Sequence, residues 1–510
     1  MDEYVVEMRH ITKRFPGIVA NDDVTIQIRP GEVYALLGEN GAGKSTMMSM
    51  LFGMYEPDDG EIVVRGETVH FRSSTDATAH GIGMVHQEFK LVNNFTVTEN
   101  IIMGAEPMTK HLGFIPGIDM KRANKEVAEL SERYGLEVNP TDMIEDLPVS
   151  TRQRVEILKM LYREADILIF DEPTAMLTPQ EIDSLLKIID ELRASGKTII
   201  LITHKIEEVR RIADRCAVLR RGKLVGVYDV GSISSQELAN LMVGRNVQLT
   251  TSKAAPQYKD TVLEVEHLTV RNEDKVEVVK DVSFKIRGGE IFAIAGVSGN
   301  GQTEVADAIA GLMEVHSGTI KLCGTDITNM GVRDRVKCGM SYIPEDRQGV
   351  GLFLDFTLSQ NLGLRRYYKE PLSKNGILHY DEFDTYADQL IDEYDIRSGQ
   401  GGKTIVRSMS GGNQQKAIVA REIEEHTPLV IFVQPTRGLD IGAIENIHNA
   451  ILEERDKGYA VLLVSLDLDE IMQLADTIGV IFGGELLKVA DASTMTSQEV
   501  GRYMMGVTEA

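Results

Sequence analysis

Short apolar runs alternate along this chain with longer stretches in which apolar residues recur at helical spacing. The runs Val33–Leu37, Ile167–Phe170 and Thr198–Thr203 predict strands buried on both faces, since apolar residues fill successive positions. The amphipathic stretch Glu181–Ser195 predicts a helix that covers them, and Cys216–Val227 predicts a β-hairpin. Strands and helices that alternate in this way are typical of an α/β fold with a mostly parallel sheet.

The same succession of segments occurs twice, so the chain contains an internal repeat. The matching pairs are Glu32–Thr46 with Glu290–Thr303, Ile167–Thr178 with Leu429–Asp440, Thr198–Glu208 with Ala460–Glu470, and the hairpin Cys216–Val227 with the hairpin Ile478–Val489. Because both order and spacing are kept, the pattern indicates a duplicated domain and not a chance pairing of short strings.

The repeat sets the domain boundaries that we predict. The first domain spans residues 1–245, a linker spans 246–260, and the second domain spans 261–510. The linker is a polar stretch with one proline and no periodicity. Residues 89–159 are rich in helix-forming residues, which predicts a separate helical subdomain within the first domain.

A phosphate-binding motif follows the first predicted strand. Gly38–Ser45 reads GENGAGKS and matches the pattern G-x-x-x-x-G-K-[ST]. The glycines let the backbone N–H groups face phosphate oxygens, while Lys44 is expected to reach the terminal phosphates and Ser45 to ligate Mg²⁺. From this loop we expect ATP to contact Gly38, Asn40, Gly41, Gly43, Lys44, Ser45 and Thr46.

Two carboxylates end the second predicted strand. Asp171 and Glu172 follow Ile167–Phe170, and beside a phosphate loop this arrangement predicts that Asp171 holds Mg²⁺ through water and that Glu172 polarises the attacking water. Taken alone, the pair could be solvated residues at a helix start. Gln87 and His204 are single residues, and their interpretation depends on the family resemblance given below.

Composition narrows the class of protein. Hydrophobic residues make up 43% and charged residues 26%, which is ordinary for a globular protein. The net charge of −24 argues against a nucleic-acid partner, since such proteins need basic surface to neutralise phosphates. Cys216, Cys323 and Cys338 have no metal-ligand spacing and predict reduced thiols. We find neither a secretory signal nor an apolar run near the roughly 18 residues of a membrane span, so a membrane function would need another subunit for the pore.

Over essentially its whole length the chain resembles the ATP-binding-cassette (ABC) family. The residues that carry the resemblance are Gly38–Ser45, Gln87, Asp171 with Glu172, His204, and the signature-like run Met409-Ser410-Gly411-Gly412-Asn413. The resemblance implies an α/β fold of two tandem P-loop NTPase domains, each with a mostly parallel core sheet, a β subdomain and a helical subdomain. It implies ATP and Mg²⁺ as cofactors, with Gln87 contacting the metal and acting in catalysis beside Glu172 and His204.

The two copies have lost different motifs. In the second copy, the residues at the family's key positions are Gln302 for the P-loop lysine, Glu345 for the Q-loop glutamine, Val433 and Gln434 for the two carboxylates, and Leu466 for the switch histidine. In the first copy the signature position reads Leu147–Thr151, where Pro148 removes an N–H and Ser150 replaces a glycine. The first copy also lacks the aspartate that Gly438–Asp440 provides in the second.

These losses predict one complete ATP site. In this family two domains meet head to tail, so the resemblance implies intramolecular pairing in which Ser410, Gly411 and Gly412 cap ATP held by the first copy. The other composite site would be damaged on both sides. Phe15 precedes the first P-loop strand and is placed to stack on adenine, whereas Arg271–Val278 in the second copy has no aromatic residue.

The motif combination resembles ATPase subunits of importers for simple sugars and nucleosides. This resemblance implies two integral-membrane permease subunits, an extracytoplasmic solute-binding (lipo)protein that acts through them, and a peripheral position on the cytoplasmic face of the membrane. The segment His86–Pro107 resembles the nucleoside branch, with monosaccharides of the ribose or galactose type as the alternative cargo. A soluble twin-cassette ATPase acting on ribosomes or DNA, and an ATP-sensing scaffold that does not hydrolyse ATP, are further alternatives. The short linker and absent cysteine cluster oppose the former, and intact Glu172 and His204 oppose the latter.

Overall fold

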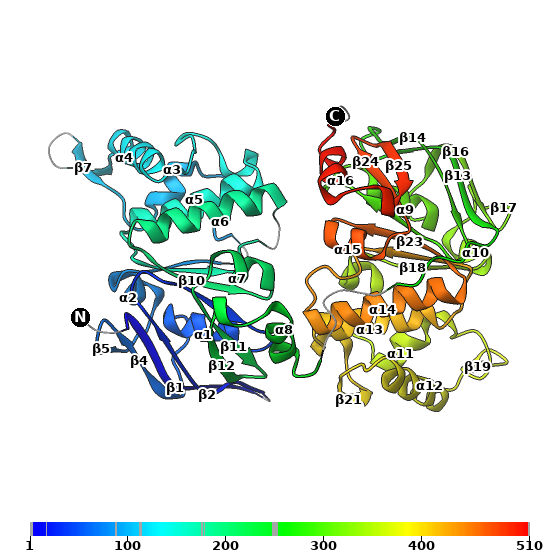
Figure 1. The fold of residues 1–510 in the computed structure, drawn as a ribbon, viewed down its shortest axis with the longest axis horizontal. Helices are drawn as coiled ribbons and strands as arrows, with labels where there is room; N and C mark the ends of the chain where they lie inside the picture. Colours follow the sequence, from blue (N-terminus) through cyan, green and yellow to red (C-terminus); the bar gives the residue numbers. More distant parts are fainter. Residues whose placement is uncertain are drawn as a thin grey trace. The chain divides into compact units, whose positions relative to one another are not determined.

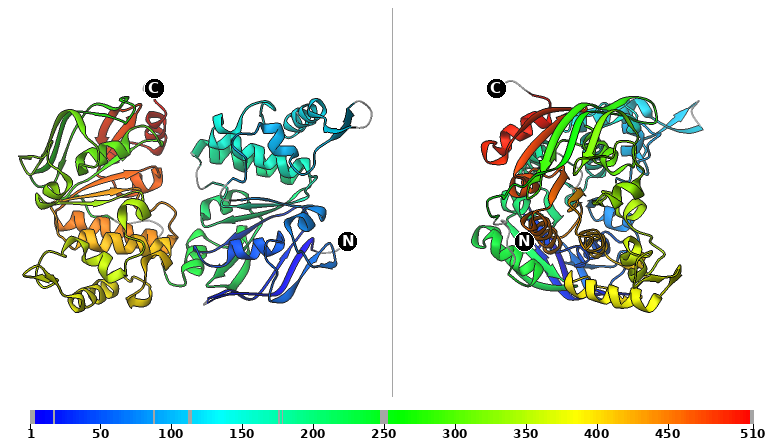
Figure 2. Two further views of the ribbon diagram at one scale, coloured as in Figure 1. Left: turned by 180° about the vertical axis from the view of Figure 1, so that it is seen from behind. Right: turned by 90° about the vertical axis from the view of Figure 1, so that its right-hand side faces the viewer.

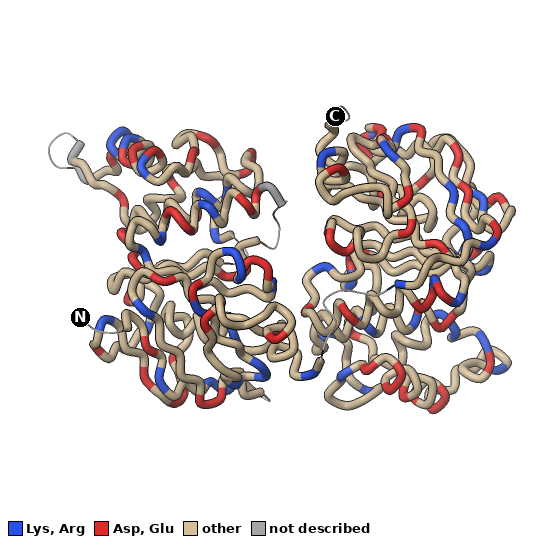
Figure 3. The backbone as a smooth tube through the Cα atoms, viewed as in Figure 1, with Lys and Arg blue, Asp and Glu red and all other residues tan. Residues whose placement is uncertain are grey.

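The computed structural model describes residues 4–16, 18–86, 89–111, 115–174, 177, 179–246 and 253–507. The chain divides into two compact units, Met1–Val247 and Gln248–Ala510 (Figure 1). The division falls within the stretch 246–260. Acidic and basic residues are interspersed along the backbone of each unit (Figure 3). Among the described residues, no helix combines the length and the apolar character that crossing a membrane requires.

An antiparallel sheet and a mostly parallel sheet form the framework of the first unit. The antiparallel sheet has the strand order β2-β1-β4-β5, and the mostly parallel sheet has the order β12-β11-β3-β10-β9-β6, with β12 antiparallel to β11. The strands are β1 (Val6–Phe15), β2 (Ile18–Ile28), β3 (Val33–Leu37), β4 (Asp59–Val64), β5 (Glu67–Val69), β6 (Ile82–Val85), β7 (Met108–His111), β8 (Ile115–Ile118), β9 (Ile167–Asp171), β10 (Thr198–Thr203), β11 (Arg215–Arg220) and β12 (Lys223–Asp229). The helices are α1 (Lys44–Leu51), α2 (Ser74–Ala79), α3 (Val97–Ile102), α4 (Met120–Arg133), α5 (Val149–Tyr162), α6 (Pro179–Ala194), α7 (Ile206–Ile212) and α8 (Ser235–Val243).

Each face of the mostly parallel sheet is covered, which explains its uninterrupted apolar strands. Helix α1 lies between the two sheets, and α5 and α6 cover the other face (Figures 1 and 2). Along β9, Ile167 and Ile169 join the core shared with α1 and the antiparallel sheet, whereas Leu168 and Phe170 join the core shared with α5 and α6. Successive side chains point to opposite faces of a strand, so a sheet buried on both sides needs apolar residues at every position.

The second unit repeats this architecture. Its antiparallel sheet has the order β14-β13-β16-β17, and its mostly parallel sheet has the order β18-β22-β23-β15-β24-β25. The strands are β13 (Thr261–Arg271), β14 (Glu277–Arg287), β15 (Ile291–Ala295), β16 (Val315–Leu322), β17 (Thr325–Asp326), β18 (Met340–Ile343), β19 (Ser373–Lys374), β20 (Ile377–Leu378), β21 (Gly399–Gly402), β22 (Leu429–Val433), β23 (Ala460–Ser465), β24 (Thr477–Phe482) and β25 (Glu485–Asp491). The helices are α9 (Gln302–Ala310), α10 (Val332–Lys337), α11 (Leu358–Leu362), α12 (Tyr380–Glu393), α13 (Gly411–Ile423), α14 (Ile441–Lys457), α15 (Leu468–Leu474) and α16 (Ser497–Met504).

The predicted fold class is confirmed, and the predicted elements agree with the structure with small shifts at their ends. The strand predicted at Ile167–Phe170 continues to Asp171, and the helix predicted at Glu181–Ser195 is α6, Pro179–Ala194. Both predicted hairpins form, as β11–β12 and β24–β25. The helical subdomain of the first unit also contains the small antiparallel pair β7–β8, which we did not predict because strands of four residues carry too little periodicity.

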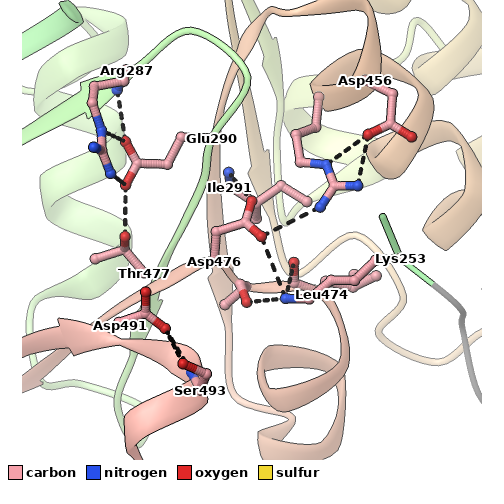
Figure 4. A network of polar contacts seen from close by, with 12 residues as sticks. Lys253, Arg287, Glu290, Ile291, Asp456, Leu474, Asp476, Thr477, Asp491 and Ser493 are labelled. Atoms are coloured by element: carbon pink, nitrogen blue, oxygen red, sulfur yellow. Dashed lines mark hydrogen bonds and ion pairs between the residues drawn. The ribbon is translucent and has the colours of Figure 1, made fainter. Parts of the chain in front are cut away.

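A buried ion pair in the second unit holds the end of α14 against the sheet (Figure 4). Arg455 lies 3.3 Å from Asp476, and both side chains are almost fully buried. The other carboxylate oxygen of Asp476 accepts the backbone N–H of Ile291 at the start of β15. Lys253, close to the junction of the units, lies 3.5 Å from Asp476 and donates to the carbonyl of Ala475. One carboxylate therefore joins a helix, a strand and the segment that enters the unit.

We expect Arg455→Ala to destabilise the second unit by about 3–5 kcal/mol, because it leaves Asp476 buried without its guanidinium partner. Faster hydrogen exchange in β15 and β24 of the full-length chain would measure the loss. The first unit supplies a control, since the equivalent pair Arg193–Asp214 is about one-third to one-half exposed and Arg193→Ala should have a much smaller effect. Equal effects of the two substitutions would contradict this explanation.

Candidate functional site

The parallel pairing of three neighbouring strands places predicted site residues of the first unit along one edge of the sheet. Strand β10 pairs in parallel with both β3 and β9. The phosphate loop follows β3, His204 follows β10, and Asp171 ends β9. Carboxyl ends of parallel strands lie at the same sheet edge, which is where open α/β sheets bind ligands.

The phosphate loop depends on glycine at Gly43. This residue precedes α1 with φ 96°, and a Cβ atom there would lie 2.3 Å from the carbonyl oxygen of Ala20. A side chain is therefore excluded by both conformation and space. The start of α1 has no side-chain cap, so the N–H groups of its first turn, which includes Lys44, Ser45 and Thr46, are oriented to receive an anion.

Lys44 is held beneath the loop. Its side chain is buried, with the residue 4% exposed, and Nζ donates to the carbonyl oxygens of Gly38 at 2.7 Å and Glu39 at 3.0 Å. These bonds draw the two ends of the loop together around the ammonium group. A cation held at the loop by two backbone carbonyls can neutralise the charge of a phosphate bound there.

Ser45 and Asp171 form a pair of oxygen groups that fits a divalent cation. The Ser45 hydroxyl donates to Oδ1 of Asp171 at 3.1 Å. Burial and, to a smaller extent, the neighbouring Glu172 charge raise the pKa of Asp171, the Ser45 hydroxyl and Lys44 oppose them, and the net result is a pKa of about 6. A carboxylate whose charge is only partly compensated, together with a neighbouring hydroxyl, provides two hard oxygen ligands suitable for Mg²⁺.

Glu172 and His204 lie together at the ends of their strands. Nδ1 of His204 is 3.2 Å from Oε1 of Glu172, and both side chains are largely buried. Glu172 has left-handed backbone, φ 47°, and its N–H donates to the carbonyl of Ile202 in β10 at 2.9 Å. Burial acts to raise the pKa of Glu172, but the hydrogen bond and charge of His204, with Lys44, outweigh it and lower that pKa. The pair thus keeps an ionised carboxylate at the sheet edge, able to accept a proton from water.

The second unit keeps this backbone but changes the chemistry. Gln434 has φ 50°, and its N–H donates to Val464 as that of Glu172 does to Ile202. Its Oε1 accepts the N–H of Leu466 at 3.3 Å, and the acidic position before it is the buried Val433. The phosphate loop likewise persists, with Gly301 at φ 101° before α9.

A neutral amide replaces the lysine in the second loop. Nε2 of Gln302 donates to the carbonyl of Val297 at 3.0 Å, reproducing the bond from Lys44 to Glu39. Oε1 of Gln302 is buried and has no hydrogen-bond partner among the described residues. Glu345 forms an ion pair with Arg437, so its carboxylate is engaged within the unit. The second loop therefore retains a phosphate-loop shape without the cation.

The signature-like run of the second unit lies at a helix N-terminus. Ser410 is the N-cap of α13 and makes no side-chain bond to the helix backbone, although its hydroxyl accepts from Asn413 at 2.9 Å. Ser410 and Gly411 are exposed, and the position of a Cβ on Gly412 has no neighbour closer than 3.6 Å. In the first unit, Pro148 takes the N-cap position of α5. The second unit therefore offers an exposed helix N-terminus lined by small residues, whereas proline occupies the equivalent cap position in the first unit.

Two predicted residues stand apart from this cluster. Phe15 ends β1 and packs edge-on against Tyr55, with ring centroids 5.4 Å apart, so the structure leaves its contact with adenine a prediction. Gln87 lies outside the described residues. The sequence interpretation also missed Asn21, whose Nδ2 donates to the carbonyl of Gly43 at 3.2 Å. The available signal was a polar residue at the position where the repeat has the apolar Val279.

Comparison with known proteins identifies the family of the chain. The family model described as "ABC transporter" matches residues 21–175 and 279–437. The chain is 50% identical to the nucleoside import ATP-binding protein NupA of Lactococcus lactis subsp. cremoris (strain MG1363) over 99% of both chains. It is 51% identical to the guanosine import ATP-binding protein NupO of Bacillus subtilis (strain 168), over 99% of this chain and 98% of that one. It is 38% identical to the ribose import ATP-binding protein RbsA 1 of Streptomyces avermitilis, over 97% and 92% of the two chains.

We expect Lys44→Ala and Glu172→Gln to lower ATP hydrolysis by on the order of 10²–10³-fold or more, since each removes charge aimed at the reacting phosphate or water. The repeat provides matched controls, and Gln302→Ala and Gln434→Ala should leave most of the activity. Steady-state ATPase assays of the full-length variants make the comparison. A Gln434→Ala variant as inactive as Glu172→Gln would refute the assignment of hydrolysis to the first unit.

We also expect the buried charge of Asp171 to destabilise the metal-free and nucleotide-free chain. Because its folded pKa of about 6 lies above that of the unfolded chain, the folded state binds the extra proton, and stability falls as pH rises from roughly 4 to 6. Asp171→Asn should therefore stabilise the chain at pH 7.5 by on the order of 2 kcal/mol, with the gain vanishing near pH 4. Urea unfolding at both pH values tests this, and an Asn variant less stable than wild type at pH 7.5 would contradict it.

Proposed function

Because this chain belongs to the ABC transporter family and is an ATPase, we propose that it energises an importer of nucleosides with one competent composite ATP site. The observation that carries the site proposal is the division of intact chemistry between the units. The first unit has Lys44, Asp171 and the Glu172–His204 pair, whereas the second has the accessible helix end at Ser410. The second unit lacks the lysine, the carboxylates and the histidine of the first, and the first unit lacks the glycine-containing signature of the second.

In the proposed site, the first unit binds the phosphates and performs hydrolysis. Backbone N–H groups from Gly41 to Thr46, with Lys44, hold the β- and γ-phosphates. Glu172, kept ionised by His204, orients the attacking water and accepts its proton. Bound Mg²⁺ would be held by Ser45 and Asp171, with Gln87 as a further proposed contact, and it would supply positive charge against the phosphate oxygens.

The second unit completes the proposed site from the opposite side. Ser410, Gly411 and Gly412 would present a helix N-terminus to the γ-phosphate when the two units of the same chain close on one another. The tether between the units favours this intramolecular pairing, because it holds complementary surfaces at high local concentration. ATP binding would close the units and hydrolysis would release them.

Exposed apolar residues after the Q-loop positions support docking to permease subunits. In the second unit Phe353 and Phe356 stack with ring centroids 5.1 Å apart, yet are 57% and 43% exposed, and Val350 beside them is 57% exposed. Phe95 is the exposed aromatic of the corresponding segment in the first unit. Apolar clusters of this kind mark contact surfaces. We propose that two integral-membrane permeases cover them, placing the chain on the cytoplasmic face of the membrane beneath an extracytoplasmic solute-binding protein.

Relatedness favours nucleosides as the cargo. The relatives named for nucleoside and guanosine import are 50% and 51% identical to this chain, against 38% for the relative named for ribose import. A monosaccharide importer is the second candidate, because the ribose relative aligns over nearly the whole chain as well.

We expect cells that lack this subunit to lose uptake of labelled guanosine or adenosine and to keep uptake of ribose and galactose. Complementation with wild type should restore nucleoside uptake, and complementation with Glu172→Gln should not. Loss of sugar uptake alone would replace the proposed cargo and keep the ATPase mechanism. Unchanged uptake of all four solutes would refute the importer assignment for these cargoes.

A further inference from the structure

A buried carboxylate on α7 joins the two segments that carry Glu172 and His204. Glu208 is 4% exposed. Its Oε1 accepts from the hydroxyl of Thr174 at 2.5 Å, and its Oε2 accepts from the hydroxyl of Thr203 at 3.1 Å. Thr174 lies two residues after Glu172, and Thr203 lies directly before His204. One side chain thus connects the ends of β9 and β10 just beyond the residues proposed for hydrolysis.

Lys205 closes the same cluster. Its Nζ lies 3.5 Å from Oε1 of Glu208 and 3.4 Å from the carbonyl oxygen of Thr174. Its backbone N–H donates to the hydroxyl of Thr203 at 3.0 Å. The charge of the buried carboxylate is therefore paired, and both carboxylate oxygens are engaged. Such fully bonded buried groups hold backbone segments at a defined separation.

We propose that Glu208 is a positioning residue for ATP hydrolysis, keeping Glu172 and His204 at contact distance; this role rests on the function proposed for that pair. The separation of these two side chains, 3.2 Å, spans two different loops. The link from Thr174 through Glu208 to Thr203 ties the two loops together by side chains next to that pair, and Lys205 adds a bond to the carbonyl of Thr174. Small displacements of a catalytic group cost large factors in rate.

The second unit has a glutamate at the position of Glu208 but no glutamate–histidine pair beside it. Glu470, 3% exposed, accepts from the hydroxyl of Thr436 at 2.8 Å, as Glu208 does from Thr174. Its other contact is His448 at 3.0 Å, and its Oε2 has no hydrogen-bond partner among the described residues. The residues at the positions of Glu172 and His204 are Gln434 and Leu466. Glu470 therefore has the burial and threonine contact of Glu208 without an acid–histidine pair beside it.

This pairing of equivalent residues gives the test. We compare kcat, KM for MgATP and Tm of full-length Glu208→Ala and Glu470→Ala. We expect Glu208→Ala to lower kcat at least about tenfold with KM within about twofold, since its contacts lie away from the phosphate loop. Glu470→Ala should keep kcat within about twofold of wild type while losing a similar amount of Tm. Equal loss of kcat in both variants, or a rise in KM that accounts for the loss in Glu208→Ala, would overturn the proposal.

A milder substitution covers the case in which Glu208→Ala does not fold. Thr203→Val removes one hydroxyl contact, and we expect a smaller fall in kcat, about threefold or more, at unchanged KM. Unchanged kcat in Thr203→Val would overturn the proposal. Glu172→Gln and His204→Ala, measured in parallel, separate the two failures: if these remain active the proposed hydrolytic pair is wrong, whereas if they are inactive and Glu208→Ala is fully active, only the positioning role is wrong.

Discussion

Parallel pairing of β10 with β3 and β9 is the constraint on which the first unit's chemistry depends. It brings together a loop near residue 40, a carboxylate pair near residue 171 and a histidine near residue 204, at one edge of one sheet. Burial of both sheet faces holds the strands in place, because moving a strand out of the sheet would expose apolar side chains of two cores at once.

The two units share the backbone conformation at the site but differ in the side chains that it carries. The left-handed backbone of Glu172 recurs at Gln434, and the bond from Lys44 to its loop recurs from Gln302. Left-handed backbone at a residue other than glycine carries a free-energy cost, so its retention indicates that the surrounding sheet and loops impose it. The second unit keeps the local fold without the charged groups, since the apolar cores and backbone bonds do not involve those groups.

Burial gives the remaining charged groups their properties. Asp171 has a raised pKa because it is buried. Glu172 beside it has a lowered pKa because the hydrogen bond and charge of His204 stabilise its ionised form. Neighbouring carboxylates with opposite pKa shifts suit different roles, one awaiting a cation and the other ready to accept a proton. The two pKa shifts differ in direction because β10, which pairs with β9, is followed by His204, and His204 contacts Glu172.

The amino-acid sequence alone determined the buried strands, the two-domain organisation and the phosphate loop. Apolar runs predicted the buried strands, because a sheet covered on both faces leaves no polar positions, and the repeat predicted two domains of one fold. The glycine and lysine spacing of Gly38–Ser45 predicted the phosphate loop, since backbone conformation there depends on residues adjacent in sequence. The pair β7–β8 escaped prediction because its strands are too short to show a period.

Only the tertiary structure decided which distant side chains meet. Glu172 contacts His204, which follows a different strand. Glu208, on a helix, accepts hydrogen bonds from Thr174 and Thr203. The burial that raises the pKa of Asp171 likewise depends on residues that are distant in the sequence. No local pattern encodes such contacts, because strand order and register, not proximity in sequence, bring these residues together.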